Sequence, residues 1–215
     1  MPALHGGSAH LRALAIRATH RVHNLWPQRL TGLRAVYEQV PPPPQAFARF
    51  GESSWIAPPT EIHGAHRIVV DRDVTIMEGA RIFVWDDDAT TGGLLEIGSG
   101  VRLARFNTIH CGVGVRIGND VASSDWVTIV DTWRHPGARP FPAPKALDAP
   151  VVIGDRAYLG AGCTILPGVT IGEGAFIGEG AGVTDDVPPH TKVYGYPATV
   201  VRRWNGTSWE GPEWP

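Results

Sequence analysis

A large aliphatic side chain recurs at every sixth residue in the second half of the chain, and this period restricts the fold more than any other feature. From residue 153 the sequence reads IGDRAY, LGAGCT, ILPGVT, IGEGAF and IGEGAG. Each unit fits a short strand and a tight turn, in which glycine allows conformations that side chains resist. Because six is a multiple of the two-residue strand period, the same face points inward in every unit, whereas a helix would lose the register within two turns. The inward positions are Ile153, Leu159, Ile165, Ile171, Ile177 and Val183, and the smaller or β-branched positions four residues later are Ala157, Cys163, Val169, Ala175 and Ala181.

The same period continues upstream, interrupted by changes of phase. Two segments do not fit it, WDDDATTGG (85–93) and the proline-rich stretch 131–150, and we expect both to be loops that project from the wall. The in-phase sets are Ile56, Ile62 and Ile68; Val70, Ile76 and Ile82; Ile97, Leu103, Ile109 and Val115; and Ile117 to Ile129, with Ser123 between them in a core position.

Composition agrees with a single domain built from short strands. The 215 residues include 26 glycines and 19 prolines, yet 43% are hydrophobic, so turns are frequent and a core exists. A net charge of −2 gives no electrostatic basis for binding nucleic acid. The only cysteines are Cys111 and Cys163, which indicates a reducing, cytoplasmic setting. We find neither a membrane-spanning stretch nor a signal peptide.

The sequence predicts three parts: an N-terminal segment (1–50), the repeat domain (51–200, with the loop insertion 131–150) and a C-terminal tail (201–215). Residues 10–39 can form basic helices, which the run Pro41 to Pro44 ends. We expect these helices to cap an open solenoid end, since an uncapped coil leaves strand edges unpaired. Association of the helices with an anionic membrane surface is the less favoured alternative.

Residues 97–203 resemble the hexapeptide-repeat acyltransferases, and within them the maltose and galactoside O-acetyltransferases. Three stretches carry the resemblance: the repeats from residue 153, the closing segment DVPPHTKVYGYPATVVRR, and Trp133-Arg134-His135-Pro136, which is similar to the family's threonine-x-His-Pro loop. The resemblance implies an all-β fold, a left-handed parallel β-helix with three hexapeptides per coil. It also implies a homotrimer with acetyl-CoA in the groove between neighbouring solenoids.

The resemblance makes His135 the candidate general base. A histidine titrates near pH 6.5, so a large neutral fraction accepts a proton at pH 7. Direct transfer from a thioester to a hydroxyl group then needs no covalent acyl-enzyme and no metal, and backbone N–H groups at a turn can stabilise the oxyanion.

The candidate acceptor site contains four further residues. His110 follows an inward isoleucine, and we place it in a turn with its ring pointing outward. Asn107 lies in a Phe-Asn segment similar to the one that lines the family's acceptor pocket. Asp131 is expected to orient His135, to cap the loop or to bind acceptor hydroxyl groups, and Trp85 is a candidate platform for a sugar.

The family's CoA groove corresponds to the last coils of this chain. At Asp185 the chain departs from the lysine that the family often has, so the arginines would supply the positive charge for the CoA phosphates. The candidate donor-site residues are Tyr158, Gly160, Glu179, Thr184, Arg202 and Arg203.

Three other functions stay open at this point. A serine acetyltransferase is one alternative, because that family shares the Arg-His-Pro and Pro-Pro-His-Thr sequence motifs with this chain (Arg134 to Pro136, Pro188 to Thr191). A γ-type carbonic anhydrase would need three histidines around one zinc ion. A non-catalytic scaffold is the third alternative, because solenoids often serve as binding surfaces. The sequence does not identify the acceptor, which we expect to be a sugar, nor the length of the acyl group.

Overall fold

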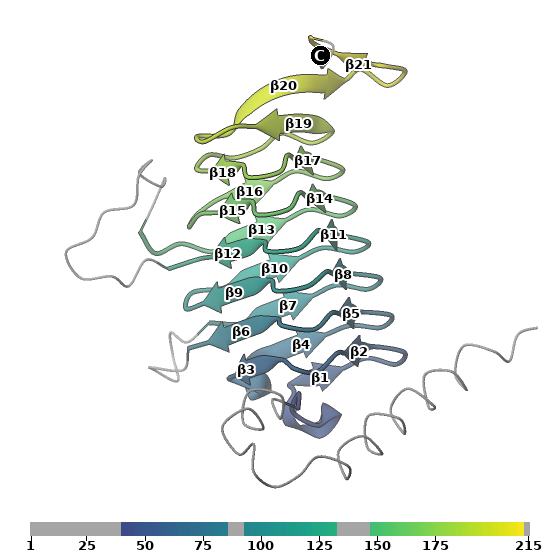
Figure 1. Cartoon of the computed structure of the whole chain (residues 1–215), viewed down its shortest axis with the longest axis vertical. Helices are drawn as coiled ribbons and strands as arrows, with labels where there is room; N and C mark the ends of the chain where they lie inside the picture. Colours follow the sequence, from purple (N-terminus) through teal and green to yellow (C-terminus); the bar gives the residue numbers. More distant parts are fainter. Residues whose placement is uncertain (1–39, 86–92, 133–146, 213–215) are drawn as a thin grey trace, which may run out of the picture. The chain divides into compact units, whose positions relative to one another are not determined.

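The computed structural model describes residues 40–85, 93–132 and 147–212, and within this part the chain winds into a solenoid of parallel strands (Figure 1). Each coil contributes one strand to each of three sheets. Sheet A contains β1 (Arg49–Phe50), β4 (Ile68–Val70), β7 (Leu95–Ile97), β10 (Val115–Ile117), β13 (Val151–Ile153) and β16 (Thr170–Ile171). Sheet B begins with β2 (Trp55–Ile56), β5 (Thr75–Ile76), β8 (Arg102–Leu103), β11 (Ala122–Ser123), β14 (Tyr158–Leu159) and β17 (Phe176–Ile177), and ends with β19 (Thr191–Tyr194), β20 (Thr199–Trp204) and β21 (Trp209–Glu210). Sheet C contains β3 (Glu61–His63), β6 (Arg81–Val84), β9 (Thr108–Cys111), β12 (Thr128–Val130), β15 (Thr164–Ile165) and β18 (Gly182–Val183).

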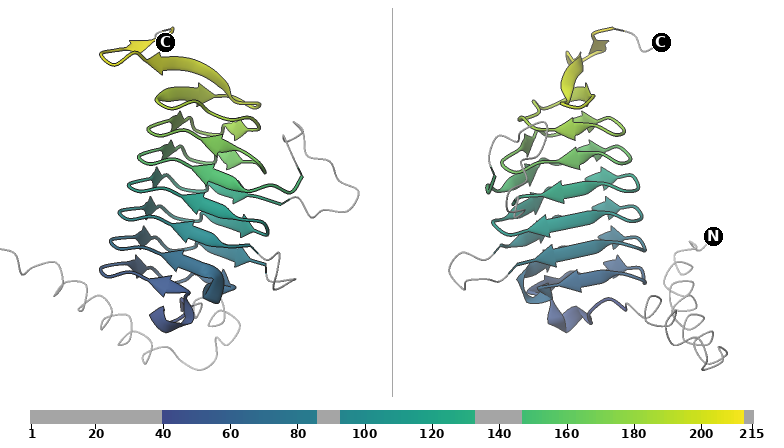
Figure 2. Two further views of the ribbon diagram at one scale, coloured as in Figure 1. Left: turned by 180° about the vertical axis from the view of Figure 1, so that it is seen from behind. Right: turned by 60° about the vertical axis from the view of Figure 1, so that its left-hand side comes forward.

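The six-residue period is the structural unit of this solenoid, as the sequence predicts. Consecutive inward positions fall on consecutive sheets: Ile153 on sheet A, Leu159 on sheet B and Ile165 on sheet C, each almost fully buried. The coils are stacked along the axis of the solenoid (Figure 2). The aliphatic side chains at the inward positions of successive coils therefore form one continuous core. The fold is the left-handed parallel β-helix expected from the resemblance.

The changes of phase do not all mark loops. Ile68 and Val70 are both buried in strand β4, and Val115 and Ile117 are both buried in strand β10. These strands of sheet A thus each contain two inward positions, and a shift of two keeps the same face inward. The pairing of Leu95 with Val115, twenty residues later, reflects this longer coil.

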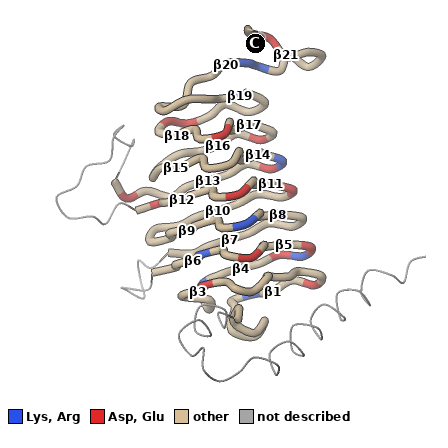
Figure 3. Tube along the Cα trace, in the orientation of Figure 1, with Lys and Arg blue, Asp and Glu red and all other residues tan. Residues whose placement is uncertain are grey.

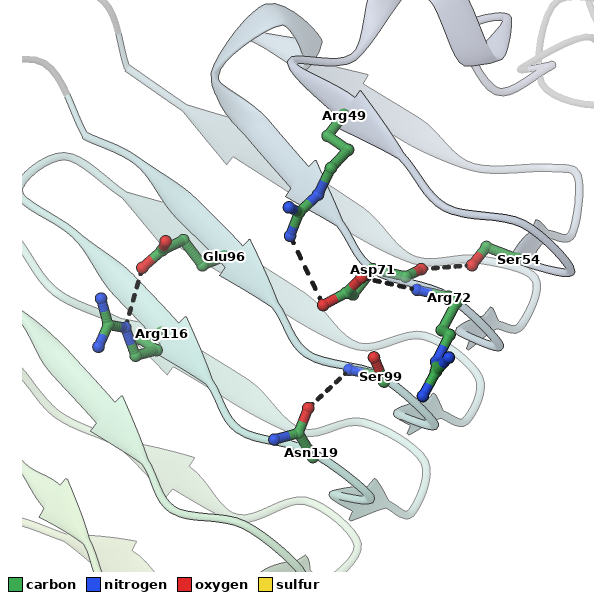
Figure 4. Close-up of polar contacts among 8 residues, drawn as sticks. All are labelled: Arg49, Ser54, Asp71, Arg72, Glu96, Ser99, Arg116 and Asn119. Atoms are coloured by element: carbon green, nitrogen blue, oxygen red, sulfur yellow. Dashed lines mark hydrogen bonds and ion pairs between the residues drawn. The ribbon is translucent and has the colours of Figure 1, made fainter.

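Polar side chains connect neighbouring coils on the outer face of sheet A and at its corner with sheet B (Figure 4). Arg116 Nε donates to Glu96 at 2.9 Å, and Arg49 lies 3.5 Å from Asp71. The backbone N–H of Ser99 donates to the Asn119 side chain at 3.0 Å. Acidic and basic residues both occur along the described solenoid (Figure 3).

Both ends of the described solenoid are covered. At the first coil, a short 3₁₀ helix (Pro44–Ala46) leads into Phe47, which is buried with its ring 5.0 Å from Phe50. At the last coil, β20 and β21 form antiparallel pairs that extend sheet B. The predicted C-terminal tail (201–215) includes the second half of β20 and all of β21, and these strands continue the hydrogen-bonding edge of β19. The predicted N-terminal helices (10–39) lie outside the described residues.

Candidate functional site

The proline-rich insertion leaves the solenoid at the corner after β12 and returns at β13. Its two ends are held together: Thr132 pairs with Asp148 in an antiparallel bridge, and the Thr132 hydroxyl donates to the Asp148 carboxylate. The backbone N–H of Ala149 donates to the carbonyl of Asp131 at 3.0 Å. His135 lies outside the described residues, but it follows this anchored exit by three positions in the sequence.

Asp131 is a buried anchor of the wall. Its carboxylate is completely shielded from solvent and accepts three backbone N–H groups, those of Gly112 at 2.7 Å, Val113 at 2.8 Å and Gly114 at 2.5 Å. Of the roles expected from the sequence, the contact with acceptor hydroxyl groups does not fit this position, because both carboxylate oxygens are already engaged inside the protein. Asp131 instead fixes the turn between β9 and β10 beneath the loop exit.

An aromatic cluster covers the outer face of sheet C beside this exit. The Phe83 ring stacks on His63 at 5.0 Å and on Trp85 at 6.0 Å, and the edge of the His110 ring meets Phe83 at 5.3 Å. Trp85 also contacts the edge of His110, at 6.3 Å. The structure therefore brings together Trp85 and His110, two of the candidate acceptor-site residues. Arg81 lies over the Phe83 ring at 5.3 Å and donates to Glu61 at 3.1 Å.

His110 lies on strand β9 rather than in a turn, which corrects the position expected from the sequence. Its ring does point outward, since the inward position is taken by Ile109. Burial among the neighbouring rings lowers the pKa of His110, and the positive charge of Arg81 lowers it further, while Asp131 acts in the opposite direction. The imidazole is consequently neutral at pH 7 and able to accept a proton.

Asn107 is occupied inside the coil. Its amide nitrogen donates to the Ala104 carbonyl at 3.2 Å and to the Ser123 hydroxyl, and its oxygen accepts the Val127 N–H at 2.7 Å. This network also satisfies Ser123, the polar residue in a core position. The structure thus gives Asn107 an internal role in place of the acceptor contact expected from the sequence, because the buried amide has no group left for a ligand.

The candidate donor-site residues lie mainly on sheet B and at its corner with sheet C. Tyr158 stacks on Phe176 at 4.9 Å, and the ammonium group of Lys192 lies over Phe176 at 5.3 Å and over Trp209 at 4.5 Å. Lys192 and Phe176 were not predicted. Their signal in the sequence is the outward strand position that they share with Tyr158: Phe176 follows Tyr158 by eighteen residues, and Lys192 follows Phe176 by sixteen.

The two arginines differ in their surroundings. Arg202 donates to the Trp209 carbonyl at 3.2 Å and buries its Nε atom without a hydrogen-bond partner among the described residues, whereas Arg203 is exposed. Thr184 is buried and donates to Asp185 at 2.7 Å. Glu179 is exposed, in the turn of the coil after Gly160. A side chain at Gly160 would collide with the backbone of that next coil.

The described residues show these predicted positions as two groups on different sheets, the acceptor group on sheet C and the donor group around sheet B. Within the described ranges there is no group of three His, Cys, Asp or Glu side chains arranged to hold a metal ion. None of the helices in this part of the chain is long and apolar enough to cross a membrane.

Comparison with known proteins agrees with the repeat architecture. The sequence profile of the bacterial transferase hexapeptide family (six repeats) matches residues 150–185. A comparison with curated protein sequences gave no significant match.

Several solved structures share the fold at low sequence identity. AntD, an N-acyltransferase from Bacillus cereus in complex with dTDP and 3-hydroxybutyryl-CoA, superimposes with a TM-score of 0.62 at 19% identity over 73% of this chain and 83% of AntD. A hexapeptide-repeat acetyltransferase from Vibrio cholerae, complexed with acetyl-CoA, superimposes with a TM-score of 0.51 at 22% identity, over 94% of this chain and 92% of the V. cholerae chain. A maltose O-acetyltransferase from Clostridium difficile superimposes with a TM-score of 0.50 at 23% identity, over 74% of this chain and 71% of that protein.

Proposed function

We propose that this chain transfers an acyl group from an acyl-coenzyme A thioester to a hydroxyl group of a sugar or another small acceptor. The acceptor oxygen attacks the thioester carbon while His135 removes the hydroxyl proton. The C–O bond forms, and the tetrahedral intermediate then collapses with cleavage of the C–S bond. The leaving thiolate of coenzyme A takes up the proton, so that an ester and the free thiol result.

The observation that carries this proposal is the anchored exit of the loop that contains His135. Asp131 and Thr132 are themselves held to the wall, and the three residues from Thr132 to His135 span at most about 11 Å. A base that must act on one hydroxyl group requires this kind of positioning, because an error of about 1 Å can reduce the rate strongly.

The structural relatives support the reaction class. AntD is an N-acyltransferase solved with coenzyme A and thymidine-diphosphate-linked ligands, whereas the C. difficile protein is an O-acetyltransferase. The higher TM-score of AntD favours one second candidate, transfer to the amino group of a nucleotide-linked amino sugar. The same base would serve both reactions, since each needs a proton removed from the nucleophile.

We further propose a homotrimer in which neighbouring copies complete the site. The outer faces of sheets B and C of one solenoid point in different directions, so the donor and acceptor groups of one copy do not face each other. A second solenoid would bring its sheet B opposite the loop exit of the first. Light scattering at micromolar concentration tests this, and a monomer would contradict it.

The decisive experiment for the function is an assay of coenzyme A release. Acetyl-CoA is offered with a panel of hexoses, disaccharides, nucleotide-linked amino sugars, small alcohols and serine. Release that depends on a sugar supports the proposal, release with amino sugars alone favours N-acylation, and release with serine alone favours the serine acetyltransferase. Zinc-dependent hydration of CO₂ would favour the carbonic anhydrase, and no release with any acceptor would favour the scaffold.

A further inference from the structure

Two exposed aromatic rings stack on each other at the corner between sheets B and C. Phe106 and Trp126 belong to successive coils, and their ring centroids lie 4.4 Å apart with an angle of 16° between the planes. Phe106 is 40% exposed and Trp126 is 62% exposed. Exposure of two adjacent aromatic rings at one corner indicates a contact surface.

Both residues adopt a backbone conformation that bulky side chains avoid. The φ angle is +60° at Phe106 and +65° at Trp126. The equivalent corner positions of three other coils are glycines with positive φ, namely Gly79, Gly162 and Gly180. Glycine adopts this conformation without steric cost, and strained conformations of other residues concentrate at ligand-binding sites. Positive φ is common at the turns of this solenoid and also occurs at Ser53, Asp73, Asp120, Arg156 and His190. The stacked pair of exposed aromatic rings, rather than the φ angle, therefore points to a function at this corner.

Along this corner of the solenoid, the space beside the turn is filled by an aromatic ring at Gly79 but is open at Gly162 and Gly180. The Phe106 ring covers Gly79 in the coil below, so that a Cβ atom on Gly79 would lie 2.2 Å from it. A Cβ atom on Gly162 or Gly180 would have no other atom within 4 Å. The Trp126 ring thus forms a step, with the glycine turns of the next two coils set back behind it. These are the turns that contain the candidate donor-site residues Gly160 and Glu179.

Polar groups flank the step. Arg105 Nη2 donates to the Asp125 carboxylate at 2.9 Å, and both side chains are partly exposed. An exposed aromatic face beside a carboxylate and a guanidinium suits a pyranose ring, whose C–H face stacks on the indole while its hydroxyl groups bond to the charged groups. A second copy of the chain fits this surface less well, because one tryptophan buries at most about 250 Å² whereas a stable interface needs about 800 Å² per partner.

We propose that Trp126, supported by Phe106, is a stacking platform that binds the sugar ring of the acceptor. This inference deepens the proposed acyl transfer and relies on it only for the identity of the ligand as the acceptor. Binding of the ring is a separate property that can be measured without any acyl donor.

The test compares three forms of the full-length chain: the wild type, Trp126→Asn and Trp55→Ala. Asparagine tolerates positive φ, so Trp126→Asn removes the ring without adding strain. Trp55 is the control, since it is another exposed tryptophan of the solenoid, 40% exposed at an outward position of sheet B in the first coil. Saturation-transfer NMR detects contact with maltose, glucose, galactose and N-acetylglucosamine, with thymidine diphosphate as a probe for a nucleobase.

We expect saturation of the sugar ring protons in the wild type and in Trp55→Ala, and a loss of about tenfold in affinity in Trp126→Asn. The melting temperature of Trp126→Asn should stay within about 2–4 °C of the wild type, because relief of the backbone strain offsets the lost stacking. With an acceptor that supports transfer, its KM should rise while the KM of the acyl donor is unchanged.

Five results would overturn the inference: no sugar binding by the wild type across the panel, equal binding by Trp126→Asn, acyl transfer with an unchanged acceptor KM in that variant, binding of thymidine diphosphate alone, or loss of the oligomer in Trp126→Asn. The last result would make the platform a contact between copies. Acyl transfer with an unchanged acceptor KM in Trp126→Asn would reject the platform and leave the proposed function intact. Sugar binding that depends on Trp126, without any acyl transfer, would reject the proposed function and leave the platform intact.

Discussion

The buried carboxylate of Asp131 accepts the backbone N–H of Gly112 at 2.7 Å, across the corner that separates one coil from the next. Residues nineteen positions apart in the sequence are thereby joined directly beneath the exit of the insertion. The same carboxylate holds the next two N–H groups, so one side chain fixes the whole turn.

Replacing Asp131 by asparagine should destabilise the protein strongly. The amide offers one acceptor oxygen in place of two and turns a donor toward backbone donors, which leaves buried N–H groups unsatisfied. We expect a loss of about 2–4 kcal/mol in the free energy of unfolding. Urea denaturation measures it, with Glu96→Gln, at an exposed ion pair, as the control that should change by less than about 1 kcal/mol. Equal losses in the two variants would contradict the anchoring role.

Loss of the His135 side chain should lower kcat by about 10²–10⁴-fold, the usual contribution of a general base. The KM of the acyl donor and the melting temperature should change little. The comparison that decides the role is His110→Ala, for which we expect mainly a higher acceptor KM. If His110→Ala abolishes turnover and His135→Ala does not, the base lies in the sheet C cluster.

The pKa of His110 predicts an acid-sensitive stability. Burial holds this pKa below its value in the unfolded chain, so the folded state resists protonation. The contribution to stability is therefore fully present above about pH 6.5 and is lost as the pH falls below it. His110→Phe keeps the aromatic packing and removes the titration. Melting temperatures from pH 7.5 to 5 should fall less in this variant, and parallel curves would refute the assignment.

The two cysteines should be inert in the folded protein. They are buried and unpaired, and burial raises the pKa of Cys163 to about 12 and that of Cys111 further. We expect reaction with Ellman's reagent at pH 8 only at the rate of unfolding. Because the folded state keeps these thiols protonated, the stability that they contribute is present below the unfolded pKa near 8.5 and declines above it. Rapid labelling of either thiol under native conditions would contradict this.

Arg203→Gln should raise the KM of the acyl donor if this exposed side chain contacts phosphate groups, and the effect should shrink as salt is added. The acceptor KM should stay unchanged. Arg202→Gln is expected to lower the stability as well, because Arg202 donates to the Trp209 carbonyl and packs inside the hairpin. Identical donor kinetics in both variants and in their combination would exclude phosphate binding by these arginines.

The fold was readable from the sequence because its period is local. Ile153, Leu159 and Ile165 report the inward face of three consecutive strands without reference to any distant residue. A phase shift of two was less informative, since it keeps the same face inward whether it arises in a loop or, as with Val115 and Ile117, in a longer strand.

Side-chain roles were decided by neighbours about twenty residues away. Asn107 and Asp131 are residue types that often bind ligands. In this fold their side chains are already hydrogen-bonded to groups of the neighbouring coils. Trp126 shows the opposite case, because the stacking of its ring on Phe106 and the empty space beside Gly162 exist only once the coils are stacked. The sequence by itself thus determined the repeat and the inward face, which depend on spacing along the chain. Only the tertiary structure decided which polar groups are already satisfied and which ring stays open, because those properties depend on contacts between coils.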